Sequence, residues 1–165
     1  RIFIVAFREP IGFTFPVGQD SSKRLKDVFD NPENVSEVLY YSQGIVTYLF
    51  NRNNERRKVF KRTIIKPESI IGCLVKNERG YVHFIHDDRI IQNRNKESLR
   101  MLTLNESLLS QGYPLNWIMP ERMKDWQNLI GNSVSPPVIQ AIGEQIIYSL
   151  LNKPEIGFKQ LQLYD

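Results

Sequence analysis

Helix boundary signals between Thr103 and Pro137 constrain the fold of this 165-residue chain more than any other feature. Thr103-x-x-Glu106 is a capping box, in which the Thr hydroxyl accepts from an orphan helix amide and the Glu carboxylate accepts from the cap amide. A helix is therefore predicted to start there, and Gly112 is placed to end it in the left-handed conformation. Pro120 predicts the start of a second helix, which ends at residues 131–132.

The two later helices carry apolar stripes that must pack against other surfaces. Met123, Trp126 and Ile130 fall on one side of the second helix. The last helix is predicted to begin after Pro136-Pro137, with a stripe at a spacing of four residues: Val138, Ile142, Ile146 and Leu150. Gly143 beside this stripe costs about 1 kcal/mol unless close packing uses its missing side chain.

The chain opens with an apolar run, residues 2–7, that contains β-branched side chains. Such a run is typical of a short strand buried on both faces, as in a parallel sheet. A lone strand cannot form a sheet, so its neighbours must come from later in the chain or from another part of the protein.

Two short helices are predicted in the next part of the chain. Ser21-Ser22 can cap the first, which places Leu25, Val28 and Phe29 on one face. The second runs from a cap near Ser42 to Arg52, although Gly44, Val46 and Thr47 disfavour it.

Residues 63–92 are rich in β-branched and aromatic types and predict two to four antiparallel strands. Residues 76–80, which end in Gly80, have the composition of a hairpin loop, because Gly supplies the positive φ that such loops need. His83 and His86 flank two apolar residues, but no other His or Cys lies at ligand spacing, which disfavours a metal site.

Composition indicates a globular protein of a reducing compartment. A hydrophobic fraction of 41% suffices for a core, and one Cys can form neither an internal disulfide nor a Cys-rich zinc site. The longest apolar stretches are far shorter than the roughly twenty residues of a membrane span. We therefore expect a cytoplasmic protein.

The net charge of +4 favours an acidic partner, and the basic residues are concentrated in one stretch. We define the basic stretch by seven cations that a single acid, Glu55, offsets: Arg52, Arg56, Arg57, Lys58, Lys61, Arg62 and Lys66. This distribution is typical of a surface that binds phosphates. A solvated face with no such partner is the alternative.

Three blocks in order resemble the DNA cytosine-5 methyltransferases. The start of the chain, RIFIVAF, resembles the end of that family's eighth motif. RMLTLNES with SQGYPLNW, from Arg100 to Trp117, resembles the ninth motif, and IGNSVSPPV, from Ile130 to Val138, resembles the final motif. The resemblance implies the C-terminal half of such an enzyme, which uses S-adenosylmethionine to methylate a cytosine lifted out of double-stranded DNA. It also implies an enzyme of a bacterial restriction-modification system, associated with the nucleoid through DNA, and makes the basic stretch the expected DNA-binding surface.

The resemblance implies roles for individual residues. Arg1 matches an active-site Arg that contacts the flipped base or a phosphate. Asn132, Ser133 and Val134 match the part of the final motif that lines the methionine end of the S-adenosylmethionine pocket. Arg100 and Glu106 belong to the ninth motif, which organises the recognition domain, and are therefore expected to be structural.

The family's nucleophile, a Cys after a Pro, has no match in this sequence. Cys73 lies in an apolar run and is interpreted as a small buried hydrophobe. Glu33-Asn34-Val35 spells the tripeptide of the family's catalytic carboxylate, but it follows the eighth-motif match where the family places it before, so Glu33 is interpreted as a loop residue.

These observations predict an α+β chain with a small mixed target-recognition domain. A strand in residues 1–10 and helices in residues 121–165 would complete an α/β, Rossmann-like methyltransferase domain, and residues 11–120 would read DNA. The chain is expected to be inactive without an N-terminal methyltransferase portion, in the same or a separate polypeptide. A non-catalytic, stand-alone DNA-binding module is the alternative.

Overall fold

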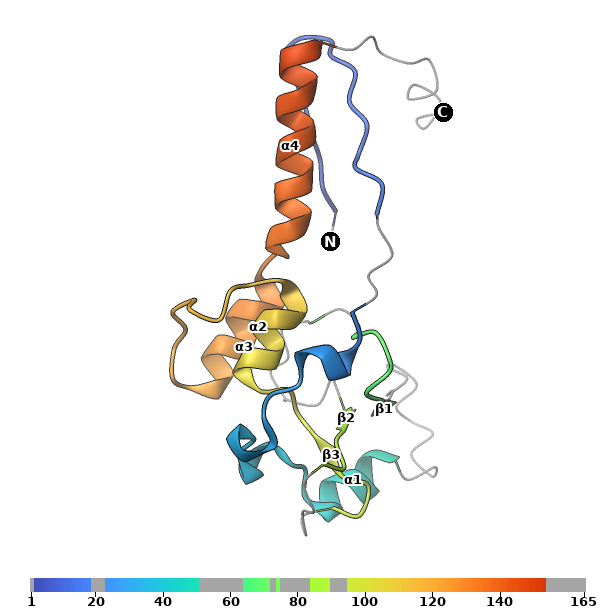
Figure 1. The fold of residues 1–165 in the computed structure, drawn as a ribbon, viewed down its shortest axis with the longest axis vertical. Coiled ribbons are helices and arrows are strands. Elements are labelled where there is room, and N and C mark those ends of the chain that lie inside the picture. The colour runs from blue at the N-terminus through green and yellow to red at the C-terminus, as the bar shows by residue number, and fades with distance from the viewer. Residues whose placement is uncertain are drawn as a thin grey trace. The chain divides into compact units, whose positions relative to one another are not determined.

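The computed structural model describes residues 2–18, 23–50, 64–71, 74, 84–89 and 95–153. The chain divides into two compact units. One combines residues 1–20 with residues 136–165, and we call it the α4 unit; the other, residues 21–135, we call the central unit. Figure 1 labels the helices and strands of both units. None of the helices in the described part is long and apolar enough to cross a membrane.

The α4 unit contains one described helix and an extended segment. Helix α4, Pro136–Asn152, begins at the predicted Pro pair and buries Ile142 and Ser149. Residues 2–18 run along this helix in Figure 1. Phe13 packs between two other rings, with centroid distances of 5.9 Å to Phe7 and 5.0 Å to Phe15.

The strand predicted at residues 2–7 forms no strand ladder with any described segment of this chain, and its place in a methyltransferase domain stays a prediction. Ile2 and Ile4 are 89% and 88% exposed, whereas Phe3, Val5 and Phe7 are half-buried. A strand exists only through hydrogen bonds to a neighbour, and no described segment supplies one. Residues 2–7 therefore have the apolar pattern of a strand, but no described segment forms a sheet with them.

Short helices begin the central unit. Residues Leu25–Val28 form the 3-10 helix η1, which buries the predicted Leu25 and Val28. Two further 3-10 turns, η2 at Pro32–Asn34 and η3 at Glu37–Leu39, lead to helix α1, Gln43–Phe50. The backbone N–H of Ile45 donates to Ser42 Oγ at 3.4 Å, which confirms the cap, while the predicted end at Arg52 lies outside the described residues.

A three-stranded sheet in the order β1-β2-β3 forms the centre of this unit. Its strands are β1, Ile64–Ile65, β2, Phe84–His86, and β3, Leu99–Arg100. The prediction of antiparallel strands within residues 63–92 is wrong in two respects. Strands β1 and β2 pair in parallel, and the antiparallel neighbour of β2 is β3, from the ninth-motif block. The predicted hairpin loop at residues 76–80 lies outside the described residues.

Strand β2 is buried on both faces because successive side chains point to opposite sides of a sheet. Ile85 packs with Leu25 of η1, and Phe84 packs with Val46 of α1. Phe84 and Ile85 are both 0% exposed. The helices on either side thus fix this strand, and β3 beside it, in one position.

Two helices complete the central unit. Helix α2, Leu104–Gln111, starts at the predicted capping box and ends at Gly112, whose φ of 82° is left-handed. Helix α3, Met123–Asn132, starts three residues after Pro120 and ends where predicted. Its Trp126 and Ile130 are buried with Leu108 of α2, and Met123 packs against this cluster, so the predicted apolar side of α3 is confirmed.

Candidate functional site

A buried ionic cluster joins the sheet to helix α2. The Arg100 side chain, on β3, is 0% exposed and forms two parallel bonds of 2.7 Å from its Nη atoms to the Glu106 carboxylate. Its Nε donates to Asp87 Oδ2 at 2.7 Å. Asp87 also accepts from Arg89, whose Nε lies 2.8 Å from Oδ1. The planar guanidinium of Arg100 thus binds one carboxylate bidentately and another through its remaining edge.

Glu106 accepts four bonds among the described residues, which matches the acceptor capacity of a carboxylate. Two come from Arg100, one from the Thr103 backbone N–H at 2.9 Å, and one from the Asp30 backbone N–H at 3.0 Å. The Thr103 hydroxyl accepts from Glu106 N at 3.1 Å, so both halves of the predicted capping box are confirmed. The prediction that Arg100 and Glu106 are structural residues agrees with this geometry.

Electrostatics keeps the cluster charged. Burial raises the pKa of Asp87, but hydrogen bonds from Arg89 and Arg100 outweigh burial and lower that pKa from 3.8 to about 2. Burial lowers the pKa of Arg100, but the hydrogen bonds and negative charges of Glu106 and Asp87 together more than reverse this, so its pKa is raised. Arg100 and Arg89 also stack over the Phe29 ring, with Cζ atoms 5.2 Å and 4.3 Å from its centroid.

Sequence reasoning missed Asp87, Arg89 and Phe29 as members of this cluster. A signal was present, because Asp87-Asp88-Arg89 follows directly on the buried residues of β2. An acid or a base directly after a strand can form an ion pair with a charged residue on the neighbouring strand. The antiparallel register, which pairs Ile85 with Arg100 and His86 with Leu99, brings Asp87 to Arg100.

The turn after α3 holds the three residues that the resemblance relates to a cofactor. Asn132 is the last residue of α3 and is exposed; its side-chain amide has no hydrogen-bond partner among the described residues. The Ser133 hydroxyl donates to the Ile130 carbonyl at 2.7 Å, and the Val134 carbonyl accepts from Tyr113 Oη at 3.1 Å. Ser133 also lines an apolar cavity of about 220 Å³ with Tyr113, Trp117 and Ile130.

The other predicted site residues are mostly outside the described part of the chain. Of the basic stretch, Lys66 is described and exposed; Arg52, Arg56, Arg57, Lys58, Lys61 and Arg62 are not described, nor are Arg1 and Cys73. Glu33 lies exposed in η2 and accepts from the Asn31 amide at 2.7 Å, as expected of a loop residue. Among the described residues, no group of three or more His, Cys, Asp or Glu could hold a metal ion.

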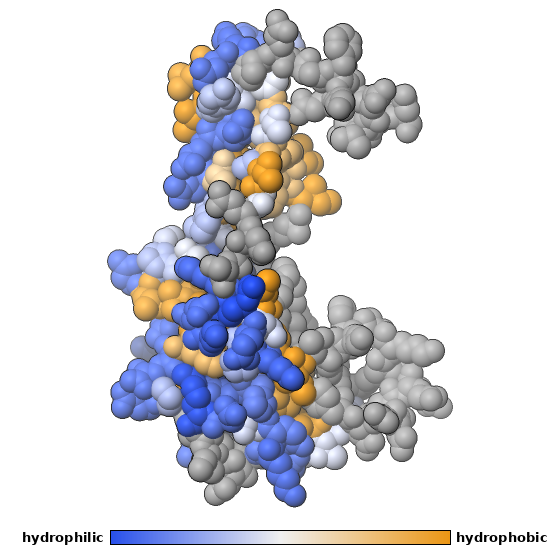
Figure 2. Space-filling view, turned by 45° about the vertical axis from the view of Figure 1, so that its right-hand side comes forward, coloured by the Kyte–Doolittle hydropathy of each residue, from blue (hydrophilic) through white to orange (hydrophobic). Residues whose placement is uncertain are grey.

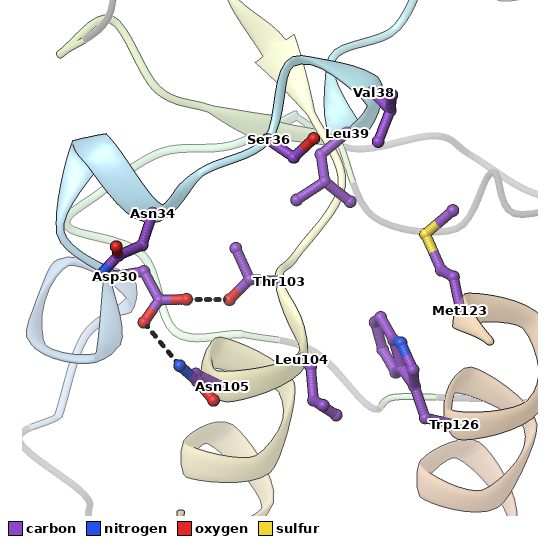
Figure 3. A pocket seen from close by; sticks show the side chains of 10 residues that line it. All are labelled: Asp30, Asn34, Ser36, Val38, Leu39, Thr103, Leu104, Asn105, Met123 and Trp126. Atoms are coloured by element: carbon purple, nitrogen blue, oxygen red, sulfur yellow. Dashed lines mark hydrogen bonds between the residues drawn. The ribbon is translucent and has the colours of Figure 1, made fainter. Parts of the chain in front are cut away.

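A second cavity, of about 320 Å³, opens between η2, η3, the start of α2 and the start of α3 (Figure 3). Its polar end is the Asp30 carboxylate, which accepts from the Thr103 hydroxyl at 2.5 Å and from the Asn105 amide at 3.2 Å. Met123 and Trp126 form its apolar end, opposite Asp30. The bonds to Asp30 tie the loop before η2 to the first turn of α2.

Comparisons with known proteins match most of the chain. A family model described as C-5 cytosine-specific DNA methylase matches residues 1–148. The chain is 28% identical over 152 residues to Type II methyltransferase M.MspI of Moraxella sp, which covers 91% of this chain and 34% of that protein. It is 27% identical over 169 residues to Type II methyltransferase M.HpaII of Haemophilus parainfluenzae, with 92% and 47% covered. The chain therefore spans about a third to a half of these relatives.

The fold is also similar to those of solved methyltransferases. The Entamoeba histolytica methyltransferase EhMeth has a TM-score of 0.60 and 20% identity, over 86% of this chain and 46% of that one. The S. pombe Dnmt2 methyltransferase has a TM-score of 0.55 and 19% identity, over 81% and 44%. Because the family match extends from residue 1 to residue 148 and includes all three motif blocks, the chain belongs to the C-5 cytosine-specific DNA methylase family.

Proposed function

We propose that this chain is the DNA-recognition and C-terminal portion of an S-adenosylmethionine-dependent DNA cytosine-5 methyltransferase of a restriction-modification system. The observation that carries the proposal is the family match over residues 1–148. The relatives' names, Type II methyltransferases, supply the restriction-modification context. The catalytic Cys and Glu would come from an N-terminal methyltransferase portion, and the assembled enzyme would act on DNA in the cytoplasm.

The basic stretch is the proposed DNA-binding surface. Its seven cations would contact phosphates and position the duplex, without reading sequence themselves. Lys66, the last cation of the stretch, is exposed and lies directly after β1, whose Ile65 is buried. Arg1 is the proposed contact to the flipped cytosine or an adjacent phosphate.

The turn at Asn132, Ser133 and Val134 is the proposed S-adenosylmethionine contact. The amide of Asn132, which has no partner in the described part of the chain, offers both donors and an acceptor, which suits the ammonium and carboxylate groups of the methionine end. The Ser133 hydroxyl already donates to Ile130 and retains capacity only to accept. When bound, S-adenosylmethionine supplies an electrophilic methyl group; this chain would orient the ligand.

Exposed apolar side chains favour the assembled enzyme over a stand-alone DNA-binding module. In the α4 unit Ile2, Ile4 and Leu151 are 89%, 88% and 78% exposed. Hydrophobic residues of this unit reach the surface in Figure 2, shown in orange over the part formed by α4. A stable module rarely leaves such a surface uncovered. The N-terminal methyltransferase portion is the proposed cover.

The test is reconstitution. The 165-residue chain should transfer no methyl groups to DNA when assayed alone, and activity should appear with the N-terminal portion joined to it or added as a separate polypeptide. Labelled S-adenosylmethionine and a set of duplexes with different sites would measure the transfer. Turnover by the pure chain would contradict the assignment of Cys73 and Glu33 as non-catalytic. DNA binding that never leads to transfer in the complete assembly would favour the stand-alone module.

A further inference from the structure

Two side-chain hydrogen bonds link the end of helix α2 to the turn that follows α3. Tyr113 Oη donates to the Val134 carbonyl at 3.1 Å. The Ser135 hydroxyl donates in the opposite direction, to the Gln111 carbonyl, at 2.8 Å. Residues separated by 21 and 24 positions in sequence are thus joined twice, within the central unit.

The α2 side of this link has a defined geometry. Gly112 takes the left-handed conformation and its N–H bonds back to Leu108 and Leu109, while the N–H of Tyr113 donates to the Leu108 carbonyl at 2.9 Å. The Tyr113 ring packs edge-on to Trp117, with centroids 5.2 Å apart. Ring packing and backbone bonds therefore hold Tyr113 without help from its hydroxyl, which leaves the hydroxyl to act on Val134.

The turn after α3 is anchored at its first residue by α3 itself. Ser133 donates to the Ile130 carbonyl through both its hydroxyl, at 2.7 Å, and its N–H, at 3.1 Å, which fixes the first part of the turn to α3. Val134 and Ser135 lie beyond that anchor. Their bonds to Tyr113 and Gln111 determine where the rest of the turn lies relative to α2.

We propose that Tyr113 and Ser135 are positioning residues for the cofactor turn, acting on S-adenosylmethionine through the backbone at Val134. This rests on the proposed function, in which residues 132–134 contact the cofactor. Neither side chain touches the cofactor in this proposal. A displaced turn is expected to bind S-adenosylmethionine less tightly, because a contact contributes its full binding energy only when its atoms lie at the correct distance from the ligand.

The test uses the assembled enzyme, with S-adenosylmethionine as the varied substrate. Tyr113→Phe keeps the ring and removes only the hydroxyl; Ser135→Ala removes the second bond. A neutral hydrogen bond is worth roughly a 2- to 10-fold change in an equilibrium constant. Each variant should therefore raise the KM for S-adenosylmethionine by about that factor, while kcat and the Kd for DNA stay within about 2-fold of wild type.

Two matched variants separate positioning from general damage. Ser135→Thr keeps the hydroxyl and should restore the wild-type KM. Ser110→Ala removes a hydroxyl that donates to a backbone carbonyl within α2, that of Glu106, and should leave the KM unchanged. Thermal melts of all variants accompany the kinetics.

The outcomes are distinguishable. An unchanged KM in Tyr113→Phe and Ser135→Ala, with wild-type methyl transfer, would overturn the positioning role and leave the proposed function intact. The same holds if both variants lose kcat, DNA binding and melting temperature together, because the bonds would then serve packing alone. Absence of methyl transfer by the wild-type assembly would instead defeat the proposed function, and the positioning role with it.

Discussion

Arg100 is the residue on which the central unit most depends. Its guanidinium is fully buried between two carboxylates, Asp87 and Glu106, which are also 0% exposed. Removing the cation leaves both carboxylates buried without their main partner, and breaking a buried pair in this way costs about 3–5 kcal/mol. Arg100→Met should lower the free energy of unfolding by that amount in urea titrations.

Two companion variants make this prediction specific. Arg100→Lys keeps the charge but loses the bidentate geometry, so an intermediate loss of about 2 kcal/mol is expected. Lys153→Met removes a cation from an exposed pair, 3.7 Å from Glu9, and should change stability by less than about 0.5 kcal/mol. Equal effects of Arg100→Met and Lys153→Met would contradict the cluster's role.

Asp87 should make stability depend on acid pH. Its pKa in the folded chain, about 2, is below the ordinary value of 3.8, so folding favours the charged form. The contribution, about 2 kcal/mol, is fully present above pH 3.8 and is lost as the pH falls through 2. The stability gap between wild type and Asp87→Asn should shrink over this range. Urea titrations from pH 5 to pH 2 would show it, and a gap that stays constant would contradict it.

At the scale of elements, Gly112 determines how α2 ends. A φ of 82° strains any residue with a Cβ, so Gly112→Ala should destabilise the chain by about 1–2 kcal/mol. Gly143→Ala is the matched control within α4, where no atom lies within 4 Å of an added Cβ. Alanine there should stabilise the chain by up to about 1 kcal/mol. Thermal melts should move in opposite directions, and two shifts of the same sign would contradict the conformational argument.

The helices were more predictable than the sheet, for physical reasons. The start and end of α2 depend on contacts within ten residues, Thr103 to Gly112, so the local sequence determines both. The pairing of β1, β2 and β3 depends on residues far apart in the chain, and strands of two or three residues carry little periodicity of their own. Local composition therefore predicted strands in residues 63–92 but not their partners or the parallel pair.

The candidate site shows the same division between local and distant information. The capping role of Glu106 follows from the spacing of Thr103-x-x-Glu106, whereas its bond to the Asp30 amide joins residues 76 positions apart. The bond from Tyr113 to Val134 likewise required the packing of α2 against α3. Only the resemblance pointed to the turn at residues 132–134, and its cofactor role remains a prediction.

For the whole molecule, recognition of DNA and binding of the cofactor are expected to be separable. Ser133→Phe places a bulky ring in the turn and should raise the Kd for S-adenosylmethionine at least about 10-fold in the assembled enzyme, with DNA affinity nearly unchanged. Calorimetric titration would measure the affinities for S-adenosylmethionine and for DNA. A thermal melt would show whether the variant is folded. Unchanged cofactor affinity in a well-folded variant would contradict a cofactor contact at this turn and would indicate that the final motif serves packing alone.

The basic stretch belongs to the same scale because it acts through total charge. Replacing Arg56, Arg57 and Lys58 by Ala should weaken binding to all DNA sequences and flatten the salt dependence by about one slope unit per lost phosphate contact. A matched variant removes three exposed charges elsewhere in the central unit: Lys26, Lys96 and Lys124. If DNA binding by the two variants depends on salt with equal slopes, the basic stretch is a solvated face and not a DNA-binding surface.

The predicted division into residues 1–10, 11–120 and 121–165 stays a prediction beside the two compact units. The units agree with this division in one respect: α4, near the end of the chain, belongs to the same unit as residues 1–20. They differ in keeping α3 with the sheet and α2.

The bond between Asp87 and Arg100 has a consequence for exchanging recognition segments between relatives. Asp87 follows β2, before the ninth-motif block, while Arg100 lies inside that block. A grafted segment that ends between them must bring an acid to the position of Asp87, or the host arginine loses a partner. Chimeras joined after β3, with both residues from one parent, should therefore fold more often than chimeras joined between residues 89 and 95.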